Sequence, residues 1–339
     1  MRKLLAAISI LIVLSSCASP TNQSASTPEK IVERNVLTNL PGENGPVLAV
    51  KIDDTEAAHP QVGLDSADVI YIEQVEGGLT RLAAVFTDQI PKVIGPVRSA
   101  RISDVEILAQ YGRVGFAYSG AQSKLRPAIS TANLENISAE INPPSIYKSD
   151  PTRDAPTNMM LEAQALLTKS IDVEGRKIDK VKSIGWQFGA IAESAKKVKT
   201  AEVKWPTARY GATWSKSEKR WLLTYNSKPN LDSNGRQLGG ANFVIQKIRI
   251  TDSIYRDKVG GVTPYSNTVG SGSGYLLRGG KVIEINWQRP NAEVGTIWTL
   301  ADGTVANFAD GQVWIALTDG EPTFTYPEGI SDAGSAKSK

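Results

Sequence analysis

A single cysteine, Cys17, limits how this chain can be held together. One thiol cannot form an internal disulfide, so the folded body must be stabilised by its hydrophobic core. The 339 residues are enough for two ordinary domains, each with a core of its own. Apolar residues make up 41% of the chain and charged residues 22%, which is typical of a globular body rather than a disordered or membrane-embedded one.

The N-terminus has the pattern of a secretory signal. Arg2 and Lys3 precede an apolar run over residues 4–14. As a helix this run spans about 16 Å, roughly half a bilayer core, which suits a signal peptide and not a spanning helix. It ends in Leu-Ser-Ser-Cys, which resembles the lipobox of bacterial lipoproteins, where the cysteine receives a diacylglyceryl group. We therefore predict a signal peptide at residues 1–16, lipid attachment at Cys17, and a location on the extracytoplasmic face of the bacterial membrane.

Composition divides the rest of the chain into five segments. Residues 17–38 are rich in Ser, Thr, Asn and Pro and are predicted to form a flexible tether, and residues 323–339 a flexible tail. Between them, all seven tryptophans fall in the second half, whereas the longest helical patterns fall in the first. We predict an α+β or mixed α/β domain at 39–175, a connector at 176–196, and a mostly antiparallel β domain at 197–322.

The first domain is predicted to contain a sheet with helices. Strands are expected at residues 46–53, 68–76, 79–86 and 113–120, and helices at 99–111, 122–132 and 158–169. Both faces of 68–76 are largely apolar, as expected for an inner strand covered on two sides. Gly77 and Gly78 favour a two-residue hairpin turn, because such a turn needs positive φ. That turn places Glu73 opposite Leu82, and Gln74 opposite Arg81.

The second domain is predicted to be built from short strands joined by tight turns. The turns are expected at Asn234-Gly235, Gly279-Gly280, Asp302-Gly303 and Asp310-Gly311. The stretch YLLRGGKVIEINW predicts a hairpin with Leu277 opposite Val282. The pattern favours an antiparallel sandwich or a partly closed barrel, with tryptophans in and around its core.

The residue types exclude several kinds of chemistry. His59 is the only histidine, and Cys17 is assigned to the lipid. The chain therefore has too few histidines and cysteines for Ser-His-Asp catalysis, for Cys-His catalysis or for a zinc site built from His and Cys. His59 itself is predicted to be an exposed loop residue. Without Arg2 and Lys3 the chain has 36 basic and 35 acidic residues, so it has no net field to attract nucleic acid.

Arginines and carboxylates of the first domain remain as candidates. The stretch IGPVRSARISD places two arginines behind a Gly-Pro turn and before a helix that Ser99 or Ser103 could cap, the latter in a capping box with Glu106. A helix N-terminus beside a guanidinium favours phosphate or carboxylate. The candidate anion site comprises Arg81, Arg98, Ser99, Arg101 and Arg153.

Internal bracing is the alternative for the same residues. In that case Arg98 and Arg101 pair with Asp53, Glu73 or Asp154 and fix the turn. Glu73 lies on an apolar strand and needs a partner, for which Arg98 and Arg153 are the candidates. Arg81 would then form a diagonal pair with Glu76. An open cleft favours the anion site, whereas arginines buried against carboxylates favour bracing.

Several blocks resemble a known family. They are HPQVGLDSADVIYI, EGGLTR, GPVRSAR, DPTRDAPTN, GSGSGYLLRGGKVIEINWQR and DGQVWIAL. Together, over roughly residues 39–318, they are similar to the YerB-like lipoproteins, domain-of-unknown-function family 3048. The resemblance implies a two-domain exported lipoprotein without a settled activity. Thr157 stands where that family more commonly has histidine.

Two functional classes follow. The first, which we favour, is a binding or accessory module without a cofactor, holding an envelope glycan, a lipid-linked phosphate or a partner protein near the membrane. The second is an envelope enzyme, because SADVIYI and GPVRSAR are somewhat similar to motifs of LytR-CpsA-Psr glycan transferases, with Ser99 where those have aspartate. That resemblance implies a magnesium ion held by Asp53 or Asp68.

Overall fold

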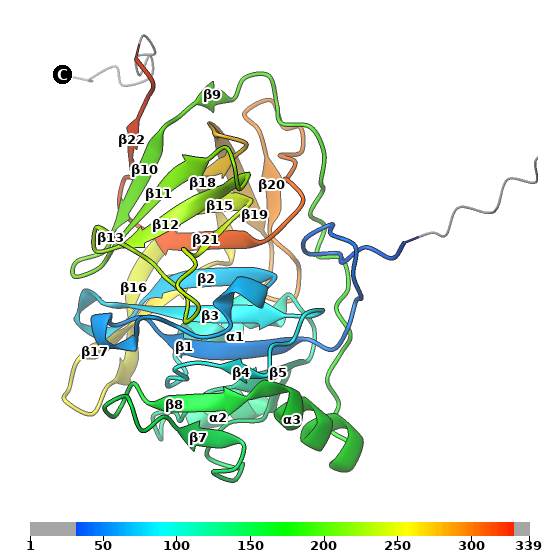
Figure 1. Ribbon diagram of the computed structural model, residues 1–339, viewed down its shortest axis with the longest axis vertical. Coiled ribbons are helices and arrows are strands. Elements are labelled where there is room, and N and C mark those ends of the chain that lie inside the picture. The colour runs from blue at the N-terminus through cyan, green and yellow to red at the C-terminus, as the bar shows by residue number, and fades with distance from the viewer. Residues whose placement is uncertain (1–31, 329–339) are drawn as a thin grey trace, which may run out of the picture. The chain divides into compact units, whose positions relative to one another are not determined.

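The computed structural model describes residues 32–328, and those from 33 onward lie in one compact unit (Figure 1). The predicted signal peptide, Cys17 and most of the tether lie outside the described residues, as do residues 329–339 of the predicted tail. Within the described part of the chain, no helix is long and apolar enough to span a membrane.

One sheet of eleven strands runs through both halves of the chain. The first half supplies β1 (Leu48–Asp53), β2 (Val69–Gln74), β3 (Thr80–Phe86), β5 (Val114–Ala117) and β6 (Leu134–Asn136). The second half supplies β9 (Lys196–Lys197), β15 (Asn242–Lys247), β18 (Gly270–Arg278), β19 (Lys281–Arg289), β20 (Ile297–Thr299) and β21 (Val313–Thr318). The halves join where β2 and β21 pair in parallel, as the side-by-side ribbons in Figure 1 show.

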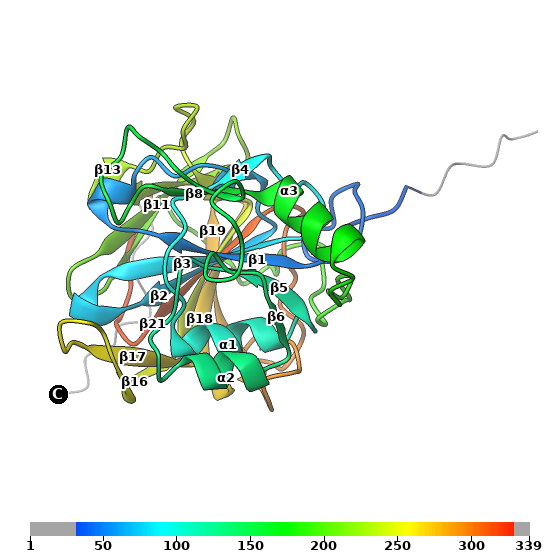
Figure 2. The same ribbon diagram turned by 90° about the horizontal axis from the view of Figure 1, so that it is seen from below.

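Smaller sheets flank the large one. A six-stranded sheet contains β10 (Thr200–Lys204), β11 (Arg209–Ser215), β12 (Arg220–Tyr225), β13 (Lys228–Pro229), β14 (Gly239–Gly240) and β22 (Thr323–Thr325). A three-stranded sheet contains β4 (Val93–Ile94), β7 (Tyr147–Ser149) and β8 (Met159–Glu162). β16 (Arg249–Arg256) and β17 (Val262–Asn267) form a hairpin of their own. The hairpin lies beside α1 (Ile102–Ala109), which packs on α2 (Arg126–Thr131) (Figure 2).

The protein is mostly β, and its helices are shorter than predicted. Residues 99–101 are extended because their backbone bonds to neighbouring segments, so α1 begins only at Ile102. The predicted helix 158–169 is strand β8 at first, and α3 (Ala163–Thr168) forms only beyond it, followed by a π turn at Lys169–Val173. One-turn 3₁₀ helices lie at Glu56–Ala58, Leu64–Ser66 and Glu76–Gly78.

Strand β2 is an inner strand, as its apolar faces predict. Ile70 and Ile72 contribute to one hydrophobic core, and Val69 and Tyr71 to the other, on the opposite side of the sheet. The first of these cores also holds the inward side chains of the six-stranded sheet, including the fully buried Trp221. The six-stranded sheet and the large sheet therefore form a sandwich. The prediction of an antiparallel second domain holds only in part, because β21 pairs in parallel both with β15 and with β2 of the first half.

The two hairpins whose registers the sequence predicts have different outcomes. Leu277 lies opposite Val282, as expected. Between β2 and β3, however, Glu73 lies opposite Arg81, so the predicted register is wrong by one residue. The turn has three residues, Glu76 to Gly78, because the Val75 N–H bonds to the Leu79 carbonyl. Both glycines adopt positive φ, at 69° and 70°.

Candidate anion-binding cleft

A cleft of about 620 Å³ brings together four of the five residues of the predicted anion site: Arg81, Arg98, Ser99 and Arg101. Its second wall comes from the loop after β5, with Ser119 and Gln122, and from Arg126 at the start of α2. Its third wall is the tip of the β16–β17 hairpin, residues 257–259. The cleft is thus lined by five basic residues and by two acidic ones, Glu140 and Asp257.

The segment before α1 is extended because neighbouring backbone holds it on both sides. The Arg98 N–H donates to the Lys51 carbonyl on β1 at 2.8 Å, and the Ala100 N–H donates to the Gly120 carbonyl at 3.0 Å. Arg101 precedes the helix, and the Asp104 carboxylate accepts its N–H at 2.6 Å. Backbone bonding therefore fixes where Arg98 and Arg101 leave the chain.

The predicted capping roles are wrong. Neither Ser99 nor Ser103 caps α1, because Asp104 takes that role. Ser103 lies inside the helix and accepts a hydrogen bond from the Ser266 N–H at 3.0 Å. Glu106 accepts hydrogen bonds from the backbone of Thr268 and Val269. Ser103 and Glu106 thus connect α1 to the end of β17 and to the residues that follow it.

Of the three arginines of the predicted site that line the cleft, two are braced by carboxylates. Arg98 Nε lies 2.5 Å from Asp53 Oδ2 at the end of β1. Arg101 Nε donates to Glu76 Oε2 at 2.8 Å, and Arg101 Nη2 lies 2.8 Å from the same oxygen. Asp53 is therefore a partner as predicted, whereas Arg101 uses Glu76 rather than Glu73 or Asp154.

Arg81 is the exception among the three. Its side chain is 92% buried, and its guanidinium donates to the Ser99 carbonyl at 2.9 Å. Within residues 32–328 no carboxylate lies within 4.0 Å of it, so the predicted pair with Glu76 does not form. Burial, with the nearby charges of Arg101 and Arg98, lowers the pKa of Arg81 to about 9. A buried cation without a direct carboxylate partner is costly, and the nearby charges of Asp53 and Glu76 offset only part of that cost, so an anion in the cleft would stabilise it further.

Glu73 belongs to a buried cluster that the sequence interpretation missed. It pairs with Lys51 on β1, and not with Arg98 or Arg153. Lys51 also donates to Asp104 at 2.8 Å, and all three side chains are fully buried. The available signal was a lysine in the middle of the apolar strand PVLAVKID, which has to find a partner once it is buried.

Arg153 and Asp154 lie outside the cleft lining. Arg153 donates to the carbonyls of Ala58 and Pro60, at 2.9 and 2.5 Å, and lies 3.3 Å from Asp150. These contacts brace the loop after β1. The carboxylate of Asp154 pairs with neither Arg98 nor Arg101, and its carbonyl accepts the Thr157 N–H and hydroxyl.

Asp53 and Asp68 lie far apart along the sheet. Asp53 is opposite Arg81 at one end of β3, and Asp68 accepts the N–H and hydroxyl of Thr87 beyond the other end. Six residue steps, from Arg81 to Thr87, separate the two levels, which corresponds to about 20 Å. Within residues 32–328 no group of three or more His, Cys, Asp or Glu side chains could hold a metal ion. The two aspartates are thus separate positions, and a magnesium ion at Asp53 or at Asp68 stays a prediction.

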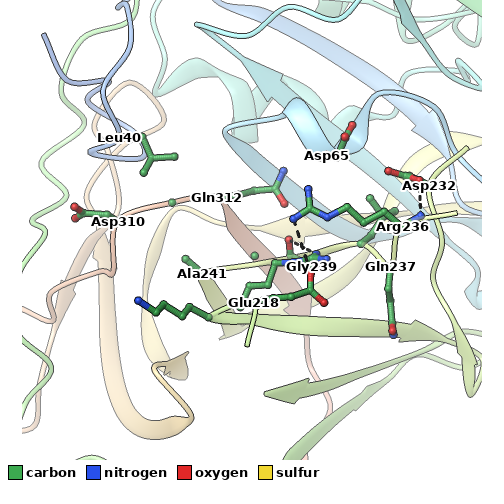
Figure 3. A pocket seen from close by; sticks show the side chains of 15 residues that line it. Leu40, Asp65, Glu218, Asp232, Arg236, Gln237, Gly239, Ala241, Asp310 and Gln312 are labelled. Carbon is green, nitrogen blue, oxygen red and sulfur yellow. Dashed lines mark hydrogen bonds and ion pairs between the residues drawn. The ribbon is translucent and has the colours of Figure 1, made fainter. Parts of the chain in front are cut away.

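A second cleft, of about 360 Å³, lies between β12, β14 and the segment around Gln312 (Figure 3). Its two arginines pair with one carboxylate, Glu218. Glu218 lies 2.5 Å from Arg220 and 3.8 Å from Arg236, and one Asp232 oxygen accepts the Arg236 N–H. In this cleft, unlike the arginine-lined one, both arginines have a carboxylate partner.

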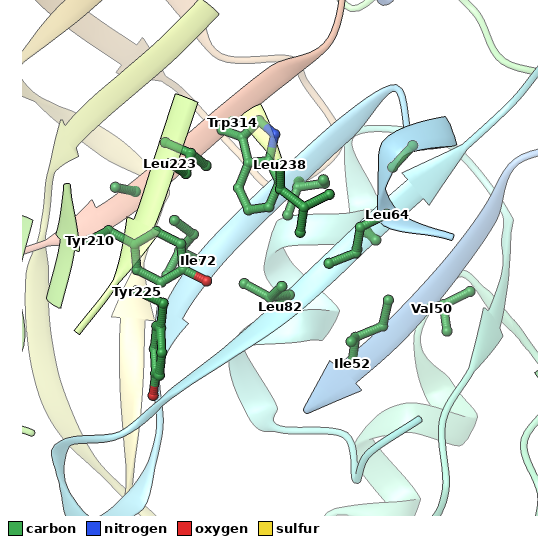
Figure 4. Packing of buried hydrophobic residues seen from close by; sticks show 14 of the residues in the cluster. Val50, Ile52, Leu64, Ile72, Leu82, Tyr210, Leu223, Tyr225, Leu238 and Trp314 are labelled. Carbon is green, nitrogen blue, oxygen red and sulfur yellow. The ribbon is translucent and has the colours of Figure 1, made fainter. Parts of the chain in front are cut away.

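His59 is not the exposed loop residue that was predicted. Its side chain is 16% exposed, and its ring stacks on Tyr225 with 4.4 Å between centroids. His59 Nε2 lies 3.3 Å from the buried Asp54, which also accepts the Tyr210 hydroxyl at 2.8 Å. Tyr210 and Tyr225 reach this region from the second half of the chain and lie near Ile72 and Leu82 (Figure 4). The loop is buried by partners that are distant in sequence.

The cleft draws residues from two regions that match known protein families. Residues 37–177 match the model described as "Protein of unknown function (DUF3048) N-terminal domain". Residues 201–315 match the model of the corresponding C-terminal domain. The chain belongs to the DUF3048 family. The resemblance seen in the sequence is therefore confirmed, and Lys258 reaches the cleft from the second DUF3048 domain.

The DUF3048 protein is also similar to individual relatives. It is 23% identical over 296 residues to "Putative lipoprotein YerB" of Bacillus subtilis (strain 168), covering 86% of this chain and 83% of that protein. It matches the crystal structure of YerB from Bacillus subtilis with a TM-score of 0.73 and 20% identity, covering 86% of this chain and 99% of that one. This likeness supports the fold.

Proposed function

We propose that this DUF3048 protein is a binding module of the bacterial cell envelope whose arginine-lined cleft holds an anionic ligand. The observation that carries the proposal is Arg81, a buried guanidinium without a carboxylate partner among the described residues, at the wall of an open cleft. A phosphate or carboxylate group in the cleft supplies the missing charge. Arginine suits both groups because its fork of N–H donors can bind two oxygens.

A lipid anchor on Cys17 is the second part of the proposal. The lipobox-like sequence before Cys17 supports it, as does the name of the Bacillus relative. An anchored protein on the extracytoplasmic face meets envelope glycans, lipid-linked phosphates and partner proteins, which are the ligands we propose. Replacing Cys17 by Ala should move the protein from the membrane fraction to the soluble one, and mass spectrometry that finds unmodified Cys17 in the native protein would contradict the anchor.

Anion binding can be measured on the full chain in detergent by titration calorimetry with inorganic phosphate at low salt. Arg81→Met should weaken binding about 10–100-fold, the value of one charge-assisted contact. Arg153→Met is the matched control, because Arg153 is a partly buried arginine that does not line the cleft. Phosphate that fails to bind, or that binds Arg81→Met unchanged, rules out the proposed site.

A further inference from the structure

The tip of the β16–β17 hairpin is held over the cleft of the first DUF3048 domain. The hairpin forms its own two-stranded sheet, and polar contacts fasten it to the first domain. Thr263 donates to Glu76, Tyr265 donates to Glu106, and the Ser266 N–H donates to Ser103. Beyond these contacts, residues 257–259 line the cleft. The second domain therefore supplies part of the ligand's surroundings.

Two of the five basic residues that line the cleft form no ion pair with a carboxylate among the described residues. Arg98 pairs with Asp53, Arg101 with Glu76, and Arg126 with Glu140 at 2.5 Å. Arg81 of the first domain and Lys258 of the second remain: in the described part of the chain, neither has a carboxylate within 4.0 Å. Asp257 lies beside Lys258, but one of its oxygens accepts the N–H groups of Val259 and Gly261 within the turn.

A polar acceptor in the same cleft is also unsatisfied. Gln122 Oε1 is buried, yet it accepts no hydrogen bond within residues 32–328. Buried acceptors are normally paired, so this one favours a ligand that donates a hydrogen bond. The hydroxyls of Ser99 and Ser119, 3.4 Å apart, offer further polar contacts on the cleft wall. A hydroxylated molecule suits these groups better than an apolar one.

We infer that the ligand is a sugar or polyol carrying two separate phosphate groups, one bound near Arg81 and the other by Lys258. This inference rests on the proposed anion-binding function. The cleft volume of about 620 Å³ supports it, because sites for whole small molecules measure roughly 300–1,000 Å³. The hydroxyls of the spacer then face Gln122 and the two serines. Recognition requires both DUF3048 domains, since each provides one of the unpaired cations.

The test compares glucose 1,6-bisphosphate with glucose 6-phosphate by titration calorimetry on the full chain in detergent. The bisphosphate should bind at least about 10-fold more tightly, because it makes one additional charge-assisted contact. Lys258→Met should remove that advantage, so that the variant binds the two sugars with similar affinity. Lys258 is exposed, so its replacement should not disturb folding. Lys228→Met, at another exposed lysine, is the control and should retain the full preference.

The outcomes separate this inference from the function on which it rests. Equal affinity for the two sugars in the unaltered protein, or a preference that survives Lys258→Met, overturns the two-phosphate inference but leaves the anion site intact. Failure of inorganic phosphate to bind contradicts the anion site itself. Arg81→Met should weaken all three probes, and this distinguishes the shared phosphate position from the one at Lys258.

Discussion

Lys51 and Asp104 form an ion pair in which both side chains are fully buried, with 2.8 Å between Nζ and Oδ1. The pair lies behind the cleft: the Lys51 carbonyl accepts the Arg98 N–H, and Asp104 accepts the Arg101 N–H. Glu73 joins the same ammonium group. A charged cluster that the cleft never exposes thus holds the backbone from which two of its arginines project.

Replacing Lys51 by Met should lower the free energy of unfolding by about 3–5 kcal/mol, because it leaves two carboxylates buried without their cation. Urea denaturation of the full chain in detergent measures the change. Lys228→Met is the control: its pair with Glu56 is at least 70% exposed on both sides, so its loss should leave the stability close to that of the unaltered protein. A loss below about 1 kcal/mol for Lys51→Met would show that the cluster does not contribute as argued.

Asp68 should make the protein less stable as the pH rises from about 4 to about 6. Burial raises the pKa of Asp68 to about 6, partly opposed by its hydrogen bonds from Thr87. In this interval the folded state therefore binds more protons than the unfolded state, so stability falls with rising pH. In Asp68→Asn this contribution disappears. Measured from pH 4 to pH 7, the stability of the unaltered protein relative to the variant should fall by about 3 kcal/mol.

The control for this prediction is Asp65→Asn, three residues earlier on an exposed position. Compared with the unaltered protein in the same way, it should show a change of less than about 1 kcal/mol over the pH range. If Asp68→Asn and Asp65→Asn behave alike, burial of the Asp68 carboxylate does not cause the pH dependence.

Strands whose faces are set by local pattern could be predicted from the sequence. The two apolar faces of β2 and the Gly279-Gly280 turn each lie within a dozen residues, so periodicity and turn chemistry are sufficient. The β2–β3 register was missed because Glu76 is part of the turn, where it is held by Arg101 and Thr263 from distant segments. Local rules for glycine turns do not contain that information.

The same distinction applies to the cleft. Arg81, Arg98 and Arg101 were predicted because they surround one turn and one strand in the sequence. Lys258 was missed because it is more than 150 residues away from that turn, in a loop whose place depends on contacts such as Ser103 with Ser266. The helix before which Arg101 stands was also predicted three residues too early, since backbone bonds to β1 and the β5 loop keep its start extended.

The two glycines of the β2–β3 turn should differ in their tolerance of alanine. Both have positive φ, which costs an L-residue about 1–2 kcal/mol. A Cβ on Gly77 meets nothing within 4 Å, whereas one on Gly78 lies 2.9 Å from Pro206 Cγ. Gly77→Ala should thus cost about 1 kcal/mol, and Gly78→Ala about 1–3 kcal/mol more because Pro206 must move. Equal losses in urea denaturation would contradict close packing of the second domain on this turn.

Removing the carboxylate beside Arg101 should strengthen anion binding while it weakens the fold. Glu76→Gln takes away the negative charge that Arg101 shares, so the cleft becomes more positive and its affinity for phosphate should rise about 3–10-fold. The gain should shrink as salt is added, because added ions screen it. Stability should fall, since Glu76 also accepts a hydrogen bond from Thr263 of the hairpin.

Glu135→Gln is the matched control, because Glu135 pairs with Arg113 and Arg176 and does not line the cleft. If Glu76→Gln weakens phosphate binding while Glu135→Gln leaves it unchanged, the carboxylate positions Arg101 rather than neutralising it, and the charge-based account of the cleft is wrong.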